Sequence, residues 1–152
     1  MLLADLLVEG RVKVPLTGGT KDEVLAELVE LVAAGMAPGA ATPILEAVRQ
    51  REREMTTGFG DGIAIPHGRT PTVDALGIAA GVTREPIDYD AVDGEPVRLV
   101  FLLVGPETAA GEHVRTLARI ARVVRRPEVR SALLAAPTVG EFVRVIRQAE
   151  AA

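Results

Sequence analysis

Cysteine is absent from this sequence of 152 residues, and its absence excludes several kinds of chemistry at once. The chain cannot form disulfide bonds, bind zinc through thiolates or use a cysteine nucleophile. A chain without cysteine is compatible with the reducing cytoplasm, so we expect a cytoplasmic protein.

Aromatic residues are also scarce, at 3% of the chain, and tryptophan is missing. Hydrophobic residues nevertheless make up 48% of the sequence, which indicates a globular protein whose core is built from Leu, Val, Ile and Ala. A chain of this length can bury one sizeable core, so we expect residues 1–152 to form a single domain.

Long apolar runs and an excess of positive charge are missing as well. The longest strongly apolar run, Leu99 to Val104, is far too short to span a bilayer. The first residues, Met1 to Asp5, have no basic region before an apolar stretch, so we expect no signal peptide and no direct membrane insertion. The net charge of −4 gives no basic footprint for nucleic acid, and we expect no nucleic-acid partner.

The alternation of helical and strand patterns predicts an α/β protein. Strands are expected at 11–16, 63–66, 76–83 and 97–104, and helices over 20–35, from 42 to a frayed end near 54, and over 111–125, 127–136 and 138 onward. Helices before, between and after strands favour a three-layer α/β/α sandwich. The Asp93-Gly94 turn joins two of the strands, so the central sheet should be mixed, with 97–104 at its centre because it is apolar on both faces.

Two threonines mark expected helix starts. Thr20 and Thr138 are each followed three residues later by glutamate, a capping-box pattern. For the helix over 111–125, we expect an inward face of Val114, Leu117, Ala118, Ala121 and Val124, and a solvated face of Arg115, Arg119, Arg122 and Arg126.

Residues 57–67, with the sequence TGFGDGIAIPH, are the most informative segment of the chain. Three glycines run into a short apolar strand that we expect to end at His67. No Lys-Ser/Thr pair follows the glycines, so the segment does not match a P-loop; the glycines instead suit a tight turn whose amides can approach a small anion. An imidazole at a strand end can act as nucleophile, base, metal ligand or phosphate carrier, or can simply bond a backbone carbonyl.

His113 and Arg51 are candidate companions of His67. His113 lies in the first turns of its helix, where the helix dipole disfavours imidazolium, so its ring should be neutral. Both histidines follow neighbouring apolar strands, and strand ends are where α/β folds gather ligands. Arg51, at the end of the second helix, can bind a phosphate bidentately or can be an ordinary solvated charge.

The segment Arg51-Glu52 and residues 57–68 together resemble the signature of the fructose–mannitol type IIA domains of the bacterial phosphoenolpyruvate-dependent sugar phosphotransferase system. The nitrogen-regulatory IIA paralogues share this signature. The resemblance continues through residues 100–104, Pro106 and His113, and ends at the Arg126-Pro127-Glu128 break, so nearly the whole chain is covered.

The resemblance implies a phosphocarrier with an α/β/α fold around a mixed sheet. His67 is expected to accept a phosphoryl group from the phosphocarrier protein HPr and to pass it to a cysteine of a IIB domain. Arg51 and His113 match the arginine and second histidine that support the phosphorylated ring. No metal and no cofactor is implied, and the apolar surface around His67 should be open to the two partner proteins.

Two other functions remain open from the sequence. In the first, phosphorylation of His67 changes affinity for a regulatory target, because phosphate adds negative charge to a docking face. In the second, His67, His113 and an aspartate such as Asp61 hold a metal in a hydrolase, although no paired-ligand spacing supports it.

Overall fold

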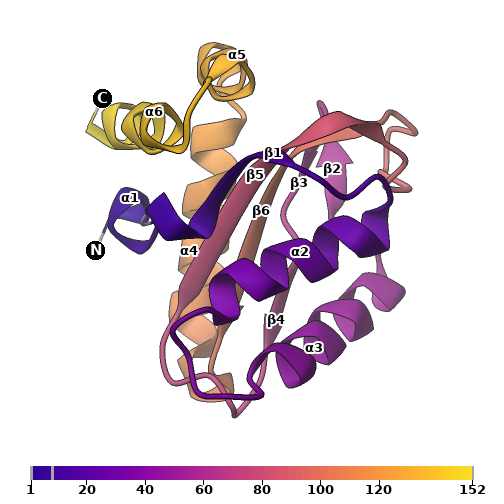
Figure 1. Cartoon of the computed structure of the whole chain (residues 1–152), viewed down its shortest axis with the longest axis vertical. Helices are drawn as coiled ribbons and strands as arrows, with labels where there is room; N and C mark the ends of the chain where they lie inside the picture. The colour runs from indigo at the N-terminus through magenta and orange to yellow at the C-terminus, as the bar shows by residue number, and fades with distance from the viewer. Residues whose placement is uncertain (1, 8, 152) are drawn as a thin grey trace.

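A mixed sheet lies at the centre of the protein in the computed structural model, which describes residues 2–7 and 9–151 (Figure 1). Within those residues six strands form one sheet in the order β1-β5-β6-β3-β2, and β4 also pairs with β6. The strands are β1 (Val12–Leu16), β2 (Gly58–Gly60), β3 (Ile63–Ala64), β4 (His67–Arg69), β5 (Gly77–Ile87) and β6 (Val97–Gly105).

Strand β6 is the centre of the sheet, as the sequence predicts. It pairs antiparallel with β5 on one side and parallel with both β3 and β4 on the other. Alternate side chains point to opposite faces, so Leu99, Phe101 and Leu103 join one core cluster while Val100, Leu102 and Val104 join the other. Such a continuous apolar run is typical of a strand in the interior of a sheet that is covered on both faces.

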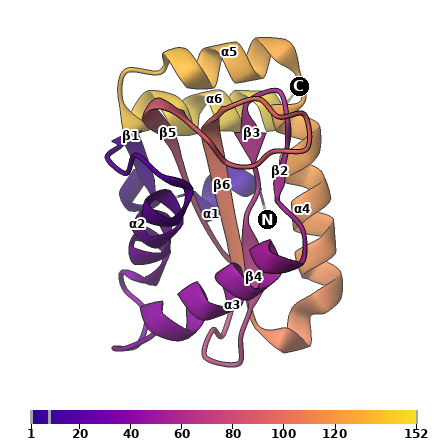
Figure 2. The same cartoon turned by 90° about the vertical axis from the view of Figure 1, so that its right-hand side faces the viewer.

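Helices cover both faces of the sheet, which confirms the three-layer α/β/α sandwich (Figures 1 and 2). One face carries α1 (Leu3–Leu6), α4 (Ala110–Val124), α5 (Pro127–Ala135) and α6 (Val139–Ala151), and the other carries α2 (Lys21–Ala33) and α3 (Ala41–Glu54). Short 3-10 turns lie at Glu9–Arg11 and Glu107–Ala109. Of the helices that the structure describes, none combines the length and apolar character needed to cross a bilayer.

Both predicted threonine caps form, but the two glutamates make contacts other than the expected ones, and the Glu141 carboxylate pairs with Arg144 at 2.9 Å. The Thr20 hydroxyl accepts the backbone N–H of Glu23 at 3.2 Å, and the Thr138 hydroxyl accepts that of Glu141 at 3.1 Å. The Glu23 carboxylate, however, accepts the backbone N–H of Gly19 at 3.1 Å, one residue before the expected partner. These side-chain oxygens satisfy N–H groups that have no partner inside the helix.

Helix α3 differs from its prediction at both ends. It begins at Ala41, one residue before the expected Thr42, and it remains helical through Glu54 instead of fraying. The Met55 backbone N–H still bonds the Arg51 carbonyl at 3.5 Å, which extends the ladder to the last residues. Arg51 therefore projects from a regular turn of helix.

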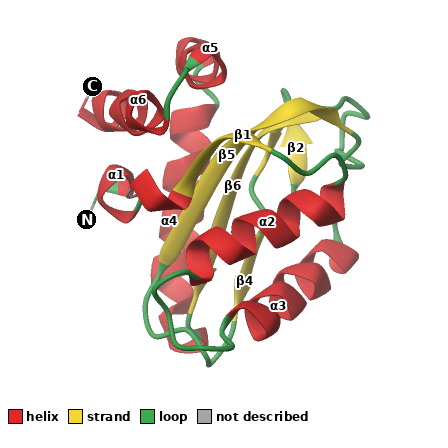
Figure 3. Cartoon of the chain, in the orientation of Figure 1, coloured by secondary structure: helices red, strands yellow, loops and turns green. Residues whose placement is uncertain are grey.

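The predicted strand over 63–66 is wrong in one respect that matters for the site (Figure 3). It divides into β3, which ends at Ala64, and β4, which begins at His67. Pro66 has no N–H to give to a ladder, although its carbonyl still accepts the Leu103 N–H at 3.0 Å. His67 thus opens a strand instead of ending one, and it lies opposite Leu103 of β6.

Candidate functional site

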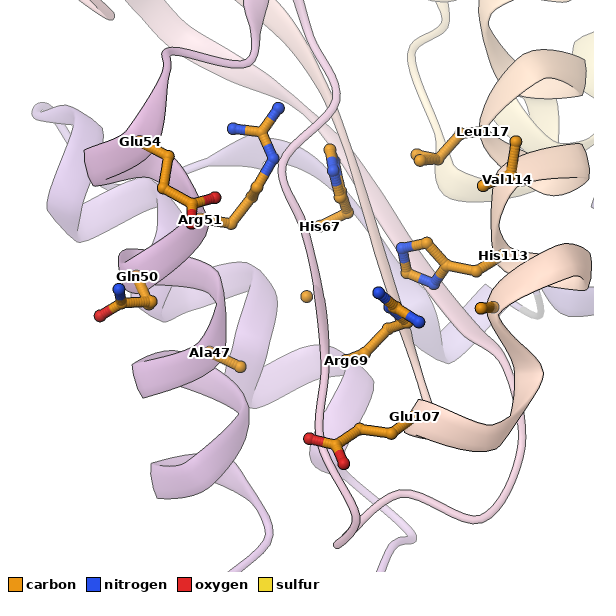
Figure 4. A pocket seen from close by; sticks show the side chains of 12 residues that line it. Ala47, Gln50, Arg51, Glu54, His67, Arg69, Glu107, His113, Val114 and Leu117 are labelled. Carbon is orange, nitrogen blue, oxygen red and sulfur yellow. The ribbon is translucent and has the colours of Figure 1, made fainter.

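A cavity of about 590 Å³ is lined by α3, β4 and α4, and the three predicted site residues all line it (Figure 4). Strand β4 contributes His67, helix α4 contributes His113, and helix α3 contributes Arg51. The remaining lining residues are Ala47, Gln50, Glu54, Gly68, Arg69, Glu107, Ala110, Val114 and Leu117.

His67 is half-buried, with its ring reached from the cavity. Its Nδ1 lies 3.0 Å from the Ile65 carbonyl oxygen. Because a carbonyl oxygen can only accept, Nδ1 must carry a proton to make this bond, and in the neutral ring Nε2 is then the nitrogen with a free lone pair. The backbone bond therefore leaves Nε2 as the ring nitrogen that is able to act as a nucleophile.

The surroundings of His67 also keep its ring neutral. Burial lowers the pKa of His67 below 6.5, the Ile65 carbonyl opposes this shift, and the positive charge of Arg51 lowers the pKa further. Glu52 raises the pKa and Arg69 lowers it, each more weakly. The net direction is downward, so the ring is neutral near neutral pH, with a proton on Nδ1 and none on Nε2.

His113 is the most deeply buried polar group of the site, with 4% of its surface exposed. Its ring centroid lies 5.6 Å from that of His67, with the planes inclined by 62°. Burial, with added repulsion from His67 and Arg69, lowers the pKa of His113 to about 4. The neutral ring predicted from the sequence agrees with this direction, but burial is its largest cause.

The tautomer of His113 follows from its buried nitrogen. Among the described residues, Nδ1 of His113 is buried and has no hydrogen-bond partner. Burying an N–H without an acceptor is costly, so the proton favours Nε2. The ring can then donate one hydrogen bond through Nε2 while remaining uncharged.

Arg51 extends from the last turn of α3 toward His67 (Figure 4). One of its terminal nitrogens, Nη1, donates to the Met55 carbonyl at 2.7 Å, which holds the guanidinium at the helix end. This hydrogen bond restrains the orientation of the guanidinium. An arginine guanidinium is suited to bind carboxylate or phosphate oxygens through two parallel N–H bonds.

A buried network on Glu52 ties this helix end to the glycine segment. The Glu52 carboxylate accepts the Thr57 hydroxyl, the Thr57 backbone N–H at 3.2 Å and the Tyr89 hydroxyl at 3.1 Å. The Lys21 ammonium lies 2.9 Å from the same carboxylate and 4.5 Å from the Tyr89 ring centroid. The network joins α2, α3, the start of β2 and the loop after β5 directly beside Arg51.

Replacement of Glu52 by glutamine is expected to lower the free energy of unfolding by about 2 kcal/mol, because hydrogen bonds to a buried charge are lost or weakened. Urea unfolding followed by circular dichroism measures this change. The matched control is Glu46→Gln on the same helix, since Glu46 is exposed and should tolerate the change with little effect. Equal stability of the two variants would contradict a structural role for the network.

The histidine titrations should be separable by NMR. We expect His67 to titrate below 6.5 and His113 near 4. Because the folded chain then binds fewer protons than the unfolded chain between these values, folding stability should fall as the pH drops from about 6.5 toward 4.

The variant His113→Gln should show a shallower loss of stability over that pH range, measured by thermal unfolding at a series of pH values. The carboxylates titrate in both proteins and cancel in the difference. A His113 signal that titrates at its ordinary value of 6.5 would contradict the burial argument.

Helix α4 is rotated relative to its predicted inward face. The buried residues are His113, Thr116, Ile120, Val123 and Val124. Val114, which was expected inside, is 65% exposed, and Ala118 is exposed as well. The Thr116 hydroxyl donates to the Glu112 carbonyl at 2.8 Å, so this polar side chain can be buried without a tertiary partner. The rotation places Val114 and Leu117 on the cavity wall.

Arg69 is a cavity residue that sequence reasoning missed. It lies two positions after His67, and Gly68 lies between them in β4. A Cβ atom on Gly68 would lie 3.0 Å from the Val48 nitrogen, so glycine is needed for α3 to approach the strand. The period-two pattern His-Gly-Arg is the signal that could have placed Arg69 beside His67.

Asp61 does not join the two histidines. It lines a different cavity, beside Arg98 and Arg130, and its backbone N–H donates to the Asp93 carboxylate at 3.2 Å. Among the residues described, no group of three or more His, Cys, Asp or Glu side chains is placed to hold a metal ion. The set His67, His113 and Asp61 therefore does not form the site that a hydrolase would need.

A known protein family and known proteins match this chain over nearly its whole length. The family model described as phosphoenolpyruvate-dependent sugar phosphotransferase system, EIIA 2, matches residues 5–149. A nitrogen regulatory protein of Pseudomonas aeruginosa is 39% identical over 144 residues, which cover 95% of this chain and 94% of that protein.

Two further proteins are similar to this chain. The fructose-specific EIIABC component of Bacillus subtilis is 32% identical over 148 residues, which cover 97% of this chain but 23% of that protein. The crystal structure of the nitrogen regulatory protein IIA-Ntr from Neisseria meningitidis superposes with a TM-score of 0.88 at 30% identity, covering 95% of this chain and 98% of that one.

Proposed function

Because the chain belongs to the EIIA type 2 family of the phosphoenolpyruvate-dependent sugar phosphotransferase system, we propose that it is a phosphocarrier that accepts a phosphoryl group on His67. The proposed donor is an HPr-like protein, and the proposed acceptor is a cysteine of a IIB domain. The observation that carries this proposal is the free Nε2 of a neutral imidazole in a cavity that also holds an arginine and a second neutral histidine.

The proposed transfer needs no proton movement at the attacking atom. The Nε2 lone pair of His67 forms a bond to phosphorus while the N–P bond of the donor phosphohistidine breaks, and the bonding electrons stay on the donor nitrogen. The His67 ring keeps its Nδ1–H, and the Ile65 carbonyl stabilises the positive charge that the ring then gains.

The neighbouring residues act on the charge of the phosphoryl group. Phosphoryl transfer has a loose, in-line transition state, so positioning and charge stabilisation supply most of the catalysis. Arg51 is proposed to bind the phosphoryl oxygens through its fork, and the Nε2–H of His113 to donate a hydrogen bond to one of them. Neither residue has to change its protonation state during the transfer.

Onward transfer reverses these roles. A cysteine thiolate of the IIB domain would attack phosphorus, the S–P bond would form, and the N–P bond would break with its electron pair returning to Nε2. Since this chain has no cysteine, the acceptor thiolate must come from a partner. The exposed Val114 and the adjacent Leu117 offer apolar surface at the cavity rim for such a partner.

The assay that tests the proposal uses purified components and phosphoenolpyruvate labelled in its phosphate. With the first enzyme of the system and HPr present, the chain should gain about one acid-labile phosphoryl group, as expected for one nucleophilic histidine. Omission of HPr should prevent labelling. A chain that takes up no label under these conditions would overturn the proposal.

A second candidate function is regulatory, and the nitrogen regulatory protein of Pseudomonas aeruginosa favours it because it matches over nearly its whole length. In this version, phosphorylation of His67 adds negative charge at the cavity rim and thereby changes the affinity for a regulatory protein target. Rapid transfer of label to candidate IIB domains would support the transport role, whereas phosphorylated protein that keeps its label in their presence would support the regulatory role.

A further inference from the structure

Arg69 lines the same cavity as His67 because the two residues lie on the same face of strand β4. Side chains alternate along β4, so His67 and Arg69 share one face while Gly68 lies on the other, where α3 packs. Backbone pairing with β6 fixes this arrangement, because His67 lies opposite Leu103 and Arg69 lies opposite Gly105. The two side chains therefore emerge from a hydrogen-bonded strand of the central sheet.

The charge of Arg69 acts on both imidazoles. It lowers the pKa of His67 and also that of His113, as a cation close to both rings does. Figure 4 shows its guanidinium beside the His113 ring, with the Glu107 carboxylate directed away from the two histidines. Arg51 approaches His67 from α3, on the other side of the cavity.

We propose that Arg69 is a second phosphate-binding guanidinium, which contacts the phosphoryl group on His67 from the side opposite Arg51. This inference rests on the proposed phosphocarrier function and adds a residue to it. A phosphoryl group brings a charge of about −1.5 to −2 into the cavity near neutral pH. The phosphorylated His67 ring and Arg51 each carry one positive charge, but Arg51 already gives one N–H to the Met55 carbonyl. Arg69 therefore supplies further N–H donors for the phosphoryl oxygens from another wall of the same cavity.

The test compares Arg69→Gln and Arg69→Lys with the parent chain and with a control, Arg122→Gln. The control makes the same change of charge on an exposed arginine of α4 that lines a different cavity. Phosphoramidate serves as the first donor, since a small molecule needs no protein docking surface. The reactions are run at about pH 8.5, two units above the ordinary imidazole pKa, so that a change in ring protonation does not affect the rate.

Phosphoramidate should label Arg69→Gln roughly five- to tenfold more slowly than the parent, which is the range for loss of a partly exposed charged hydrogen bond. The lysine variant should lie between the two, because it keeps the charge but not the fork. Arg122→Gln should match the parent. In the NMR titration, Arg69→Gln should raise the pKa values of both histidines, and the control should leave them unchanged.

Phosphorylated HPr serves as the second donor and separates phosphate binding from docking. The equilibrium fraction of phosphorylated chain should fall for Arg69→Gln with this donor as well. Slower transfer from HPr, together with an unchanged phosphoramidate rate, would overturn the inference and make Arg69 a docking residue. If the parent is labelled and Arg69→Gln behaves like the control with both donors, the inference alone fails; a parent that takes no label overturns the proposed function itself.

Discussion

Replacement of His67 by alanine is expected to abolish acid-labile labelling of the chain by phosphoenolpyruvate, the first enzyme and HPr. The reason is that the substitution removes the imidazole nitrogen Nε2, which the Ile65 bond leaves unprotonated in a ring that lines the cavity. His113 cannot replace His67 as the phosphoryl acceptor, because only 4% of its surface is exposed. Filter-bound radioactivity at saturating donor, before and after acid treatment, measures the loss.

The companion variants of His113 give a graded outcome. His113→Ala should slow labelling about 10²- to 10³-fold, the usual cost of removing one hydrogen-bond donor from a charge-stabilising site. His113→Gln should recover part of that rate because its amide retains an N–H. Full labelling of His67→Ala would place the phosphoryl group elsewhere, and an unaffected rate in His113→Ala would remove that residue from the mechanism.

The largest expected loss of stability is that of Gly81→Ala. Gly81 lies in β5, between Lys13 of β1 and Val100 of β6. An added Cβ atom would lie 2.6 Å from the Lys13 carbonyl oxygen and 2.6 Å from Leu16 Cγ, which no rotamer change can relieve on the backbone side. Overpacking of this kind should cost about 3 kcal/mol, or roughly 10 °C in the melting temperature.

Gly19→Ala is the matched control for that variant. A Cβ atom there would meet nothing closer than the Glu23 carboxylate at 3.9 Å, so the change in unfolding free energy should stay within about 0.5 kcal/mol. Urea unfolding of both variants, followed by circular dichroism, gives the comparison. A Gly81→Ala protein as stable as Gly19→Ala would show that β1 and β5 can separate without loss.

The sequence predicted secondary structure correctly where one capping residue or one apolar run determines the local structure. Thr20 and Thr138 cap their helices through their own hydroxyls, and the doubly apolar strand over 97–104 lies at the sheet centre as β6. The helix α1 was not predicted, since four residues carry no readable period. Its first two backbone N–H groups, on Leu3 and Ala4, are satisfied by the distant Glu150 carboxylate at 2.7 and 2.9 Å.

The candidate site was predicted less completely than the fold. His67, His113 and Arg51 were named from the sequence, and they line one cavity. Arg69 was missed because the strand break at Pro66 was not predicted. The break makes His67 the first residue of β4, so the alternation of side chains starts there. The face of α4 was predicted one step out of phase, since a purely apolar criterion cannot anticipate that His113 and Thr116 are buried.

The sequence by itself determined which chemistry is available to this protein. It removes thiol chemistry, offers two imidazoles, and places a glycine segment and a proline just before one of them. These properties depend on residue identity and on near neighbours along the chain, which short-range sterics and hydrogen bonding control.

Only the tertiary structure decided how that chemistry is tuned. The packing of α3 and α4 against β4 sets the distance between the imidazoles and the burial that lowers both pKa values. These quantities depend on atoms that are dozens of residues apart in the chain, because the removal of water and the approach of charges are properties of the folded surface.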